Sequence, residues 1–114
     1  MSANSSVVGY SELTAAASAK GAVDQMCRNL AVEWGVHGIR VNSINPGYTE
    51  HVPGYGDVDP GAGIPLDDGI RQMTPLGRRG RVEEFAGPCV FLASDASSYI
   101  TGMNIMVDGG YSIK

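Results

Sequence analysis

Residues 39–47 read IRVNSINPG, a short stretch in which apolar side chains alternate loosely before a proline and a glycine. Such a run predicts a buried β-strand over residues 39–44, followed by a turn at Pro46-Gly47. In an open α/β sheet, ligands bind at the carboxyl ends of the strands. We therefore expect a binding site near this turn.

The segment before this strand has the period of an amphipathic helix. Its apolar residues recur in alternating steps of three and one, which predicts a helix over residues 14–35. We expect Ser11 to cap its start, with Glu12 in the first turn. The apolar positions are Ala19, Ala22, Val23, Met26, Cys27, Leu30, Ala31 and Trp34.

The rest of the chain predicts a long loop, two helices and a second strand. Residues 50–69 have no periodicity, and a loop of that length is usually a lid, a binding loop or disordered. We expect a short helix at Ile70–Met73 and a strand over Asn104–Val107. We also expect a helix over Val82–Ser94, in which Pro88 either causes a kink or starts a second segment. Strands that alternate with helices indicate an α/β fold with a parallel sheet, although two strands make only part of one.

Composition excludes several classes of function. The chain has 114 residues and a formal net charge of -4, which argues against binding to nucleic acid or to an anionic membrane. We interpret its basic cluster, Arg78, Arg79 and Arg81, as a solvated helix start rather than a phosphate site. No apolar run reaches the roughly 20 residues that cross a bilayer, and no secretory signal is visible. A cytoplasmic protein is therefore expected.

The cysteines and histidines do not suggest a metal site. Cys27 and Cys89 are expected to be reduced and buried. His37 and His51 do not form a metal-ligand spacing with either cysteine. We expect no bound metal.

Four pieces of the sequence point to one family. They are Ser18-Ala19-Lys20-Gly21-Ala22-Val23; Ile39-Arg40-Val41-Asn42-Ser43-Ile44-Asn45-Pro46-Gly47; Pro75-Leu76-Gly77-Arg78 with Val82-Glu83-Glu84; and Phe91-Leu92-Ala93-Ser94-Asp95 continuing through Tyr99-Ile100-Thr101-Gly102 to Val107-Asp108-Gly109-Gly110. In this order and spacing the chain resembles a short-chain dehydrogenase/reductase. Within that family it is most similar to the polyol and sugar-alcohol reductases.

The resemblance implies part of a Rossmann-like parallel sheet. Residues 1–114 match the C-terminal catalytic and substrate half, without the N-terminal half that binds the dinucleotide. Family members use NAD or NADP to reduce a small carbonyl compound or to oxidise an alcohol. Neither Gly54-Tyr55-Gly56 nor Gly61-Ala62-Gly63 follows a predicted strand, so we interpret neither as a phosphate cradle. A truncated reading frame, a split gene product or an internal start would explain the missing half.

The resemblance also assigns catalytic residues. Lys20 matches the lysine that lowers the pKa of a tyrosine and holds the nicotinamide ribose. Ser2 is the candidate for the serine that polarises the carbonyl. The tyrosine belongs four residues before the lysine, where this chain has Ala16, so we expect the chain alone to be inactive. Tyr10 is about 15 Å from Lys20 along a straight helix; it could replace the tyrosine only if the loop folds back, and a pocket-lining or exposed ring is the favoured interpretation.

The turn after the first strand carries the expected cofactor contacts. The resemblance places Pro46, Gly47, Tyr48 and Thr49 beside the cofactor, with the glycine allowing close approach of the backbone. A threonine slightly further on contacts the phosphates in the family, but Thr49 comes about two residues early and His51 takes that place.

A second hypothesis belongs to another functional class. The chain could be a non-catalytic module that retains the family's interaction surfaces and forms a homo-oligomer through the helix at residues 14–35. Titration with NADH and NADPH separates the two hypotheses, because only a residual enzyme binds them saturably.

Overall fold

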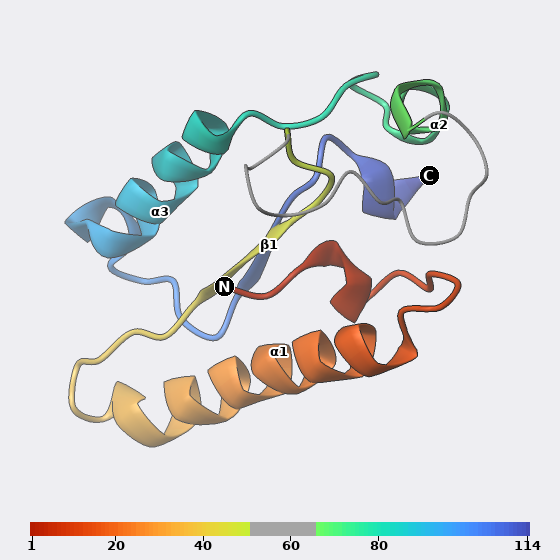
Figure 1. Cartoon of the computed structure of the whole chain (residues 1–114). Coiled ribbons are helices and arrows are strands. Elements are labelled where there is room, and N and C mark those ends of the chain that lie inside the picture. Colours follow the sequence, from red (N-terminus) through yellow and green to blue (C-terminus); the bar gives the residue numbers. More distant parts are fainter. Residues whose placement is uncertain (51–65) are drawn as a thin grey trace.

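A computed structural model describes residues 1–50 and 66–114 (Figure 1). The helices and strands are α1 (Thr14–Gly35), β1 (Ser43–Pro46), α2 (Leu66–Met73), α3 (Ala86–Ala93) and β2 (Asn104–Val107). The described residues also form four single-turn 3-10 helices: Asn4–Ser6, Val82–Phe85, Asp95–Ser97 and Tyr111–Ile113.

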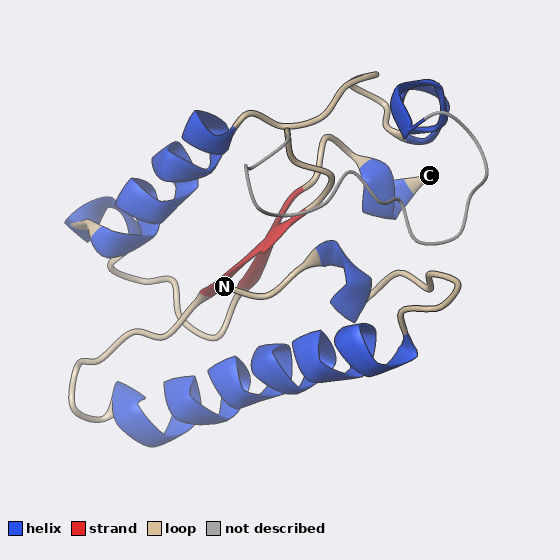
Figure 2. Ribbon diagram, in the orientation of Figure 1, coloured by secondary structure: helices blue, strands red, loops and turns tan. Residues whose placement is uncertain are grey.

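The two strands form the parallel sheet that the sequence predicts. Ser43 lies opposite Asn104, and Pro46 lies opposite Val107. The N-terminal segment runs along the other side of β1, where the Ser2 N–H donates to the Ile44 carbonyl over 2.9 Å. Figure 2 shows the strands between α1 on one face and α3 on the other, an α/β arrangement in three layers. The predicted fold class is confirmed.

Helix α1 begins and ends at the predicted residues, but its predicted cap is wrong. Leu13 occupies the N-cap position, and no side chain caps the helix. Ser11 lies in a turn, and Glu12 has a left-handed φ of 64°. The chain therefore turns sharply just before the helix, which takes the Ser11 hydroxyl away from the first-turn N–H groups.

Only part of the predicted apolar stripe of α1 is covered. Asp24, Cys27 and Ala31 are buried against the sheet. Met26 remains 55% exposed and Trp34 remains 42% exposed. The buried face is therefore rotated away from the centre of the apolar stripe, and part of that stripe faces outward.

The first strand is shifted from its predicted position at residues 39–44. It begins at Ser43 and runs through Pro46. The preceding residues are tied to the neighbouring segment by a side chain: Asn42 Nδ2 donates to the Ile100 carbonyl over 2.9 Å, and Asn42 Oδ1 accepts from the Met103 N–H over 3.1 Å. Backbone bonds from the Gly102 N–H to the Val41 carbonyl and from the Ser43 N–H to the Met103 carbonyl lie on either side of these side-chain bonds. Asn42 therefore interrupts a regular ladder, which local alternation could not reveal.

The second predicted helix is divided, but not at Pro88. Residues Val82–Phe85 form a 3-10 turn, and α3 follows from Ala86. Pro88 is then the third residue of α3, within the first turn, where no intrahelical N–H bond is lost. Helix α2 is also longer than predicted, since it starts at Leu66 rather than Ile70.

The two cysteines differ in environment. Cys27 is buried, and burial raises the pKa of its thiol. Cys89 is exposed on α3, so the prediction that both thiols are buried is wrong. Helix α3 contains no buried residue although most of its side chains are apolar. Within the described ranges, no helix combines the length and the apolar character that a bilayer crossing requires.

Candidate functional site

The carboxyl ends of the two strands meet at Gly47 and Asp108. The Gly47 N–H donates to the Val107 carbonyl over 3.1 Å. A Cβ on Gly47 would lie 2.6 Å from Asp108 Cβ and 2.7 Å from its Cα, closer than side-chain carbons approach. Glycine is therefore required here by the neighbouring strand end.

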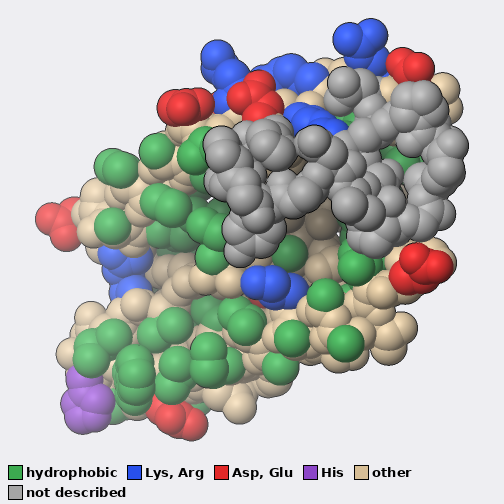
Figure 3. Space-filling view, viewed as in Figure 1, with side chains coloured by type: hydrophobic (Ala, Val, Ile, Leu, Met, Phe, Trp, Pro, Cys, Tyr) green, Lys and Arg blue, Asp and Glu red, His purple; other side chains and the backbone are tan. Residues whose placement is uncertain are grey.

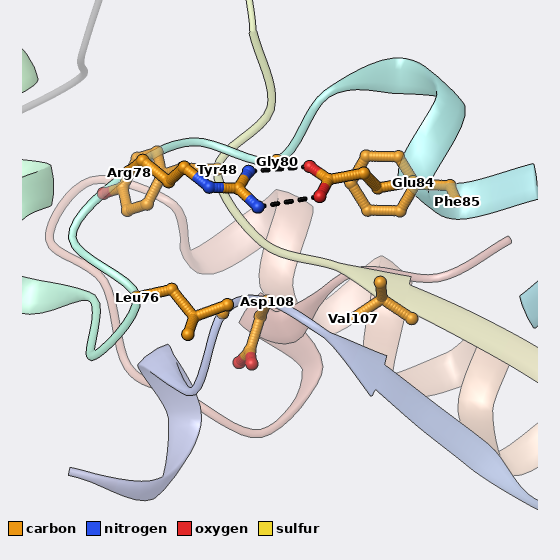
Figure 4. Close-up of a pocket in the computed structure, with 9 residues that line it drawn as sticks. Tyr48, Leu76, Arg78, Gly80, Glu84, Phe85, Val107 and Asp108 are labelled. Atoms are coloured by element: carbon orange, nitrogen blue, oxygen red, sulfur yellow. Dashed lines mark hydrogen bonds and ion pairs between the residues drawn. The ribbon is translucent and has the colours of Figure 1, made fainter. Parts of the chain in front are cut away.

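A small cavity of about 90 Å³ opens beside this contact (Figure 4). Its lining is mainly apolar, with an arginine and a glutamate facing each other on one side. The lining residues are Tyr48, Leu76, Arg78, Gly80, Glu84, Phe85, Val107, Asp108 and Gly109. The cavity has room for a few atoms only.

The charged pair at this cavity is bidentate. Arg78 donates from its two terminal nitrogens to the two Glu84 carboxylate oxygens, each over 2.7 Å. Hydrogen bonding by Arg78 lowers the pKa of Glu84 to about 2. The Glu84 carboxylate also accepts from the Arg81 N–H over 2.8 Å. These arginines therefore stabilise the helix start, which supports the structural interpretation of the basic cluster.

The same turn positions the residues that follow β1. The Gly80 N–H donates to the Tyr48 carbonyl, and the Glu50 N–H donates to the Gly80 carbonyl, both over 2.9 Å. Arg79 donates to the Thr49 carbonyl over 3.3 Å. Residues 48–50 are thus held in a fixed path beside the Arg78–Glu84 pair.

The structure joins the two predicted catalytic residues by a bond from the Ser2 side chain to the Lys20 main chain. Ser2 is 3% exposed, and its hydroxyl donates to the Lys20 carbonyl over 3.0 Å. The Lys20 side chain is half-buried, and its ammonium has no ion pair or hydrogen bond with any described residue. The Ser2 proton is therefore engaged in a structural bond, whereas the Lys20 charge is available to a ligand. The catalytic roles of both residues stay predictions.

A buried carboxylate lies one helical turn beyond Lys20. Asp24 accepts from Asn45 Nδ2 over 2.9 Å and from the Ser43 hydroxyl over 3.4 Å. Burial alone would raise the pKa of Asp24, but hydrogen bonds from neighbouring side chains, Ser6 foremost, outweigh it and lower the pKa. The network fixes α1 to the end of β1, and so sets where Lys20 lies relative to the Pro46-Gly47 turn.

No phenol precedes Lys20 on its helix. Ala16 lies four residues earlier, on the same face of α1, and is exposed. Thr49, the predicted phosphate contact, donates from its hydroxyl to the Gly47 carbonyl over 3.2 Å. His51 and the two Gly-x-Gly segments lie outside the described residues.

Three tyrosines form a cluster that the sequence did not reveal. The rings of Tyr10 and Tyr111 are stacked, with centroids 5.6 Å apart and planes 9° apart. Tyr48 meets both edge-on, with centroids at 6.3 and 5.5 Å. Tyr48 and Tyr111 each follow a strand end by two to four residues, so parallel pairing brings them to the same edge. That spacing was the signal in the sequence. Tyr10 joins the cluster because its loop folds back onto the other two rings.

The described residues do not fit a whole dinucleotide. Within residues 1–50 and 66–114, no glycine-rich turn joins a strand to a helix N-terminus, which is the usual seat of a pyrophosphate. In the same ranges, no group of three or more His, Cys, Asp or Glu side chains could hold a metal ion.

Comparison with known proteins identifies close relatives. The family model described as enoyl-(acyl carrier protein) reductase matches residues 1–112. A sorbose reductase from Candida albicans is 44% identical over 95 residues, covering 83% of this chain and 32% of that protein. A gluconate 5-dehydrogenase from Gluconobacter oxydans is 39% identical over 100 residues, covering 83% of this chain and 36% of that protein. The chain thus spans about a third of the length of these relatives.

Solved structures match across almost the whole chain. A gluconate 5-dehydrogenase from Burkholderia cenocepacia, in complex with NADP and tartrate, superposes with a TM-score of 0.88 at 33% identity. The match covers 99% of this chain and 43% of that one. A short-chain type dehydrogenase/reductase from Mycobacterium ulcerans gives a TM-score of 0.87 at 34% identity, covering 99% of this chain and 40% of that one.

Proposed function

The chain belongs to the short-chain dehydrogenase/reductase family, and we propose that it forms the substrate side of such an enzyme's site without completing the reaction by itself. Its substrate class is a small hydroxylated carbonyl compound or alcohol. Relatives named as sorbose reductase, gluconate 5-dehydrogenase and galactitol 2-dehydrogenase support that class.

The main support for the proposal is that Lys20 has an alanine, Ala16, four residues before it on the same face of α1. An ammonium four residues along a helix from a phenol favours the phenolate and lowers the pKa of the phenol. Here the ammonium is present without a partner among the described residues, and the alanine has no proton to give. Loss of a general acid costs about 10²–10⁴ in rate. The chain therefore retains the electrostatic setting for proton transfer but lacks the donor.

The cofactor of the family is NAD or NADP, and it supplies or accepts the hydride when bound. Lys20 and residues Pro46–Thr49 would lie on its nicotinamide side. The described residues offer no seat for the pyrophosphate, and the Thr49 hydroxyl is engaged with Gly47. We propose that the dinucleotide-binding half of the site is not formed by these residues.

Two assays test the proposal. The first titrates NADH and NADPH with the chain while nicotinamide fluorescence is recorded, and the second measures L-sorbose reduction with either nucleotide. The chain should give a flat titration and no turnover, and the Ala16→Tyr variant should remain inactive because the described residues still offer no seat for the pyrophosphate. Saturable binding, or turnover by the variant, would show that the site is complete apart from its proton donor.

A second function, as an oligomerisation module, has one observation in its favour. Apolar side chains cover much of the visible surface of α1 and α3 (Figure 3). Those on α1 and just after it include Met26, Val32, Trp34 and Val36, which are 42–83% exposed. Light scattering on the chain and on a Val32→Lys variant tests this function. A dimer that the substitution dissociates would support it, whereas a monomer in both samples would exclude it.

A further inference from the structure

We propose that the C-terminal turn, residues 108–114, controls whether α2 is formed, so that the turn and the helix open and close as one unit. Helix α2 lies beside this turn, past the carboxyl ends of the two strands (Figure 1). The proposal concerns a local motion of the chain. It does not depend on the proposed function, because neither nucleotide nor substrate takes part in the motion.

Helix α2 is too short to persist by itself. It has eight residues, Leu66–Met73, and an isolated helix shorter than about 12–15 residues is only marginally stable in water. Contacts with the rest of the chain must therefore stabilise it. Among its described side chains, Ile70 is 1% exposed, whereas Arg71 and Gln72 face solvent.

The C-terminal turn packs its main chain directly against the end of α2. The Leu76 N–H donates to the Gly109 carbonyl over 3.1 Å. A Cβ on Gly109 would lie 2.7 Å from Thr74 Cγ2. A Cβ on Gly110 would lie 2.9 Å from Pro75 Cγ. Both glycines also have left-handed φ angles, 64° and 88°, so this contact requires a turn without side chains.

Side chains of the turn extend the contact back along the helix. The Tyr111 hydroxyl donates to Met73 Sδ over 3.9 Å. The Lys114 ammonium donates to the Gln72 carbonyl over 3.5 Å. Each residue of 72–76 therefore meets the C-terminal turn, and detachment of the turn removes all of these contacts together.

The C-terminal turn is itself fixed to the sheet. It begins at Asp108, the residue that follows β2. The Asp108 carboxylate accepts from the Gly110 N–H over 3.0 Å and from the Ser112 N–H over 2.9 Å. On its other side, the Tyr111 ring stacks on Tyr10. The turn thus forms a platform that is held independently of α2, and the helix depends on it.

Opening of this unit would change two cavities. Leu76 and Gly109 line the small cavity at the strand ends. Ile70 and Arg71 line a second cavity of about 280 Å³. Proteins open locally in cooperative units, at free energies below that of global unfolding. Any contact that stabilises the C-terminal turn should therefore also stabilise the walls of both cavities.

Hydrogen exchange of the unaltered chain, followed by NMR, gives the first test. The Thr74 N–H donates to the Ile70 carbonyl over 2.8 Å, at the end of the helix, and the Leu76 N–H donates to the turn. One opening event exposes both amides, so their protection factors should be equal and lower than that of Cys27 in α1. If Thr74 stays protected while Leu76 exchanges freely, or if all three amides are equally protected, the proposal is wrong.

Matched glycine variants distinguish local opening from global unfolding. Gly110→Ala places a left-handed alanine against Pro75, and opening of the turn relieves the strain. Gly102→Ala introduces similar strain, at a φ of 75°, where the only atom within 4 Å of the added carbon is Ala31 Cβ. A left-handed residue other than glycine costs enough to change an opening equilibrium about tenfold.

The Thr74 amide should therefore exchange about tenfold faster in Gly110→Ala and at an unchanged rate in Gly102→Ala. Both variants should unfold at lower urea concentrations than the unaltered chain, which shows that each substitution introduces its strain. Equal acceleration of Thr74 exchange in the two variants would mean that α2 opens only by global unfolding, and the proposal would be overturned.

Discussion

The Ser2 hydroxyl donates a hydrogen bond to the main-chain carbonyl of Lys20 over 3.0 Å. The two residues are 18 positions apart, one on the N-terminal extended segment and one in α1. Their contact joins the edge of the sheet to the helix that carries the predicted catalytic lysine. It also directs the Ser2 proton into the protein rather than toward a substrate.

This contact predicts that Ser2 contributes to stability. Ser2→Ala should lower the free energy of unfolding by about 1 kcal/mol, the net value of one hydrogen bond. Urea unfolding measures the change, with Ser98→Ala at an exposed position as the control. Equal stability of the two variants would mean that the Ser2 hydroxyl is free to act elsewhere.

Gly47 should tolerate no side chain. Gly47→Ala places a Cβ 2.6 Å from Asp108 Cβ, so the strand ends must separate at a cost of about 1–3 kcal/mol. Gly21→Ala is the matched control, because no atom lies within 4 Å of the added carbon. In the middle of α1 that substitution should stabilise the protein by about 0.5–1 kcal/mol. Thermal unfolding should show a lower melting temperature for Gly47→Ala and a higher one for Gly21→Ala than for the unaltered chain.

The buried Asp24 should make stability depend on pH. Its pKa is lowered in the folded chain, so its contribution is complete above the unfolded value of 3.8 and is lost as pH falls through the folded value. Asp24→Asn removes that dependence and leaves Asn45 Nδ2 without its carboxylate, at a cost of about 1–3 kcal/mol. Unfolding from pH 7 to pH 2 measures both effects. Asp95→Asn, at an exposed position, should behave like the unaltered chain.

Glu84 should titrate well below other glutamates. Its pair with Arg78 lowers its pKa from 4.5 to about 2, so the pair is complete above pH 4.5 and is lost as pH approaches 2. NMR titration of the carboxyl carbon in the unaltered chain and in Arg78→Met measures this. The substitution should return the pKa of Glu84 toward 4.5. An unchanged value would mean that the ion pair does not form in solution.

The sequence predicted the elements whose pattern is local. The bounds of α1 and β2 are confirmed because their apolar period lies within each segment. The shift of β1 was not predictable from alternation, since it depends on Asn42 bonding to residues about 60 positions away. The tyrosine cluster was not predictable either, because it too depends on contacts between distant parts of the sequence, and its members come from three such segments. The position of Lys20 and Ala16 on one face of a helix could be predicted, because their spacing of four residues is enough to place them there.

We propose that Lys20 is placed to acidify a phenol at position 16, and the pKa of a phenol introduced there is the decisive measurement. Absorbance near 295 nm can follow the titration of the Ala16→Tyr variant, with Ala15→Tyr as the control on the same turn. We expect a pKa clearly below the ordinary value of about 10 for Ala16→Tyr only, and a return to about 10 when Lys20→Met is added. Identical titration of the Ala16→Tyr and Ala15→Tyr phenols would mean that Lys20 does not act on position 16.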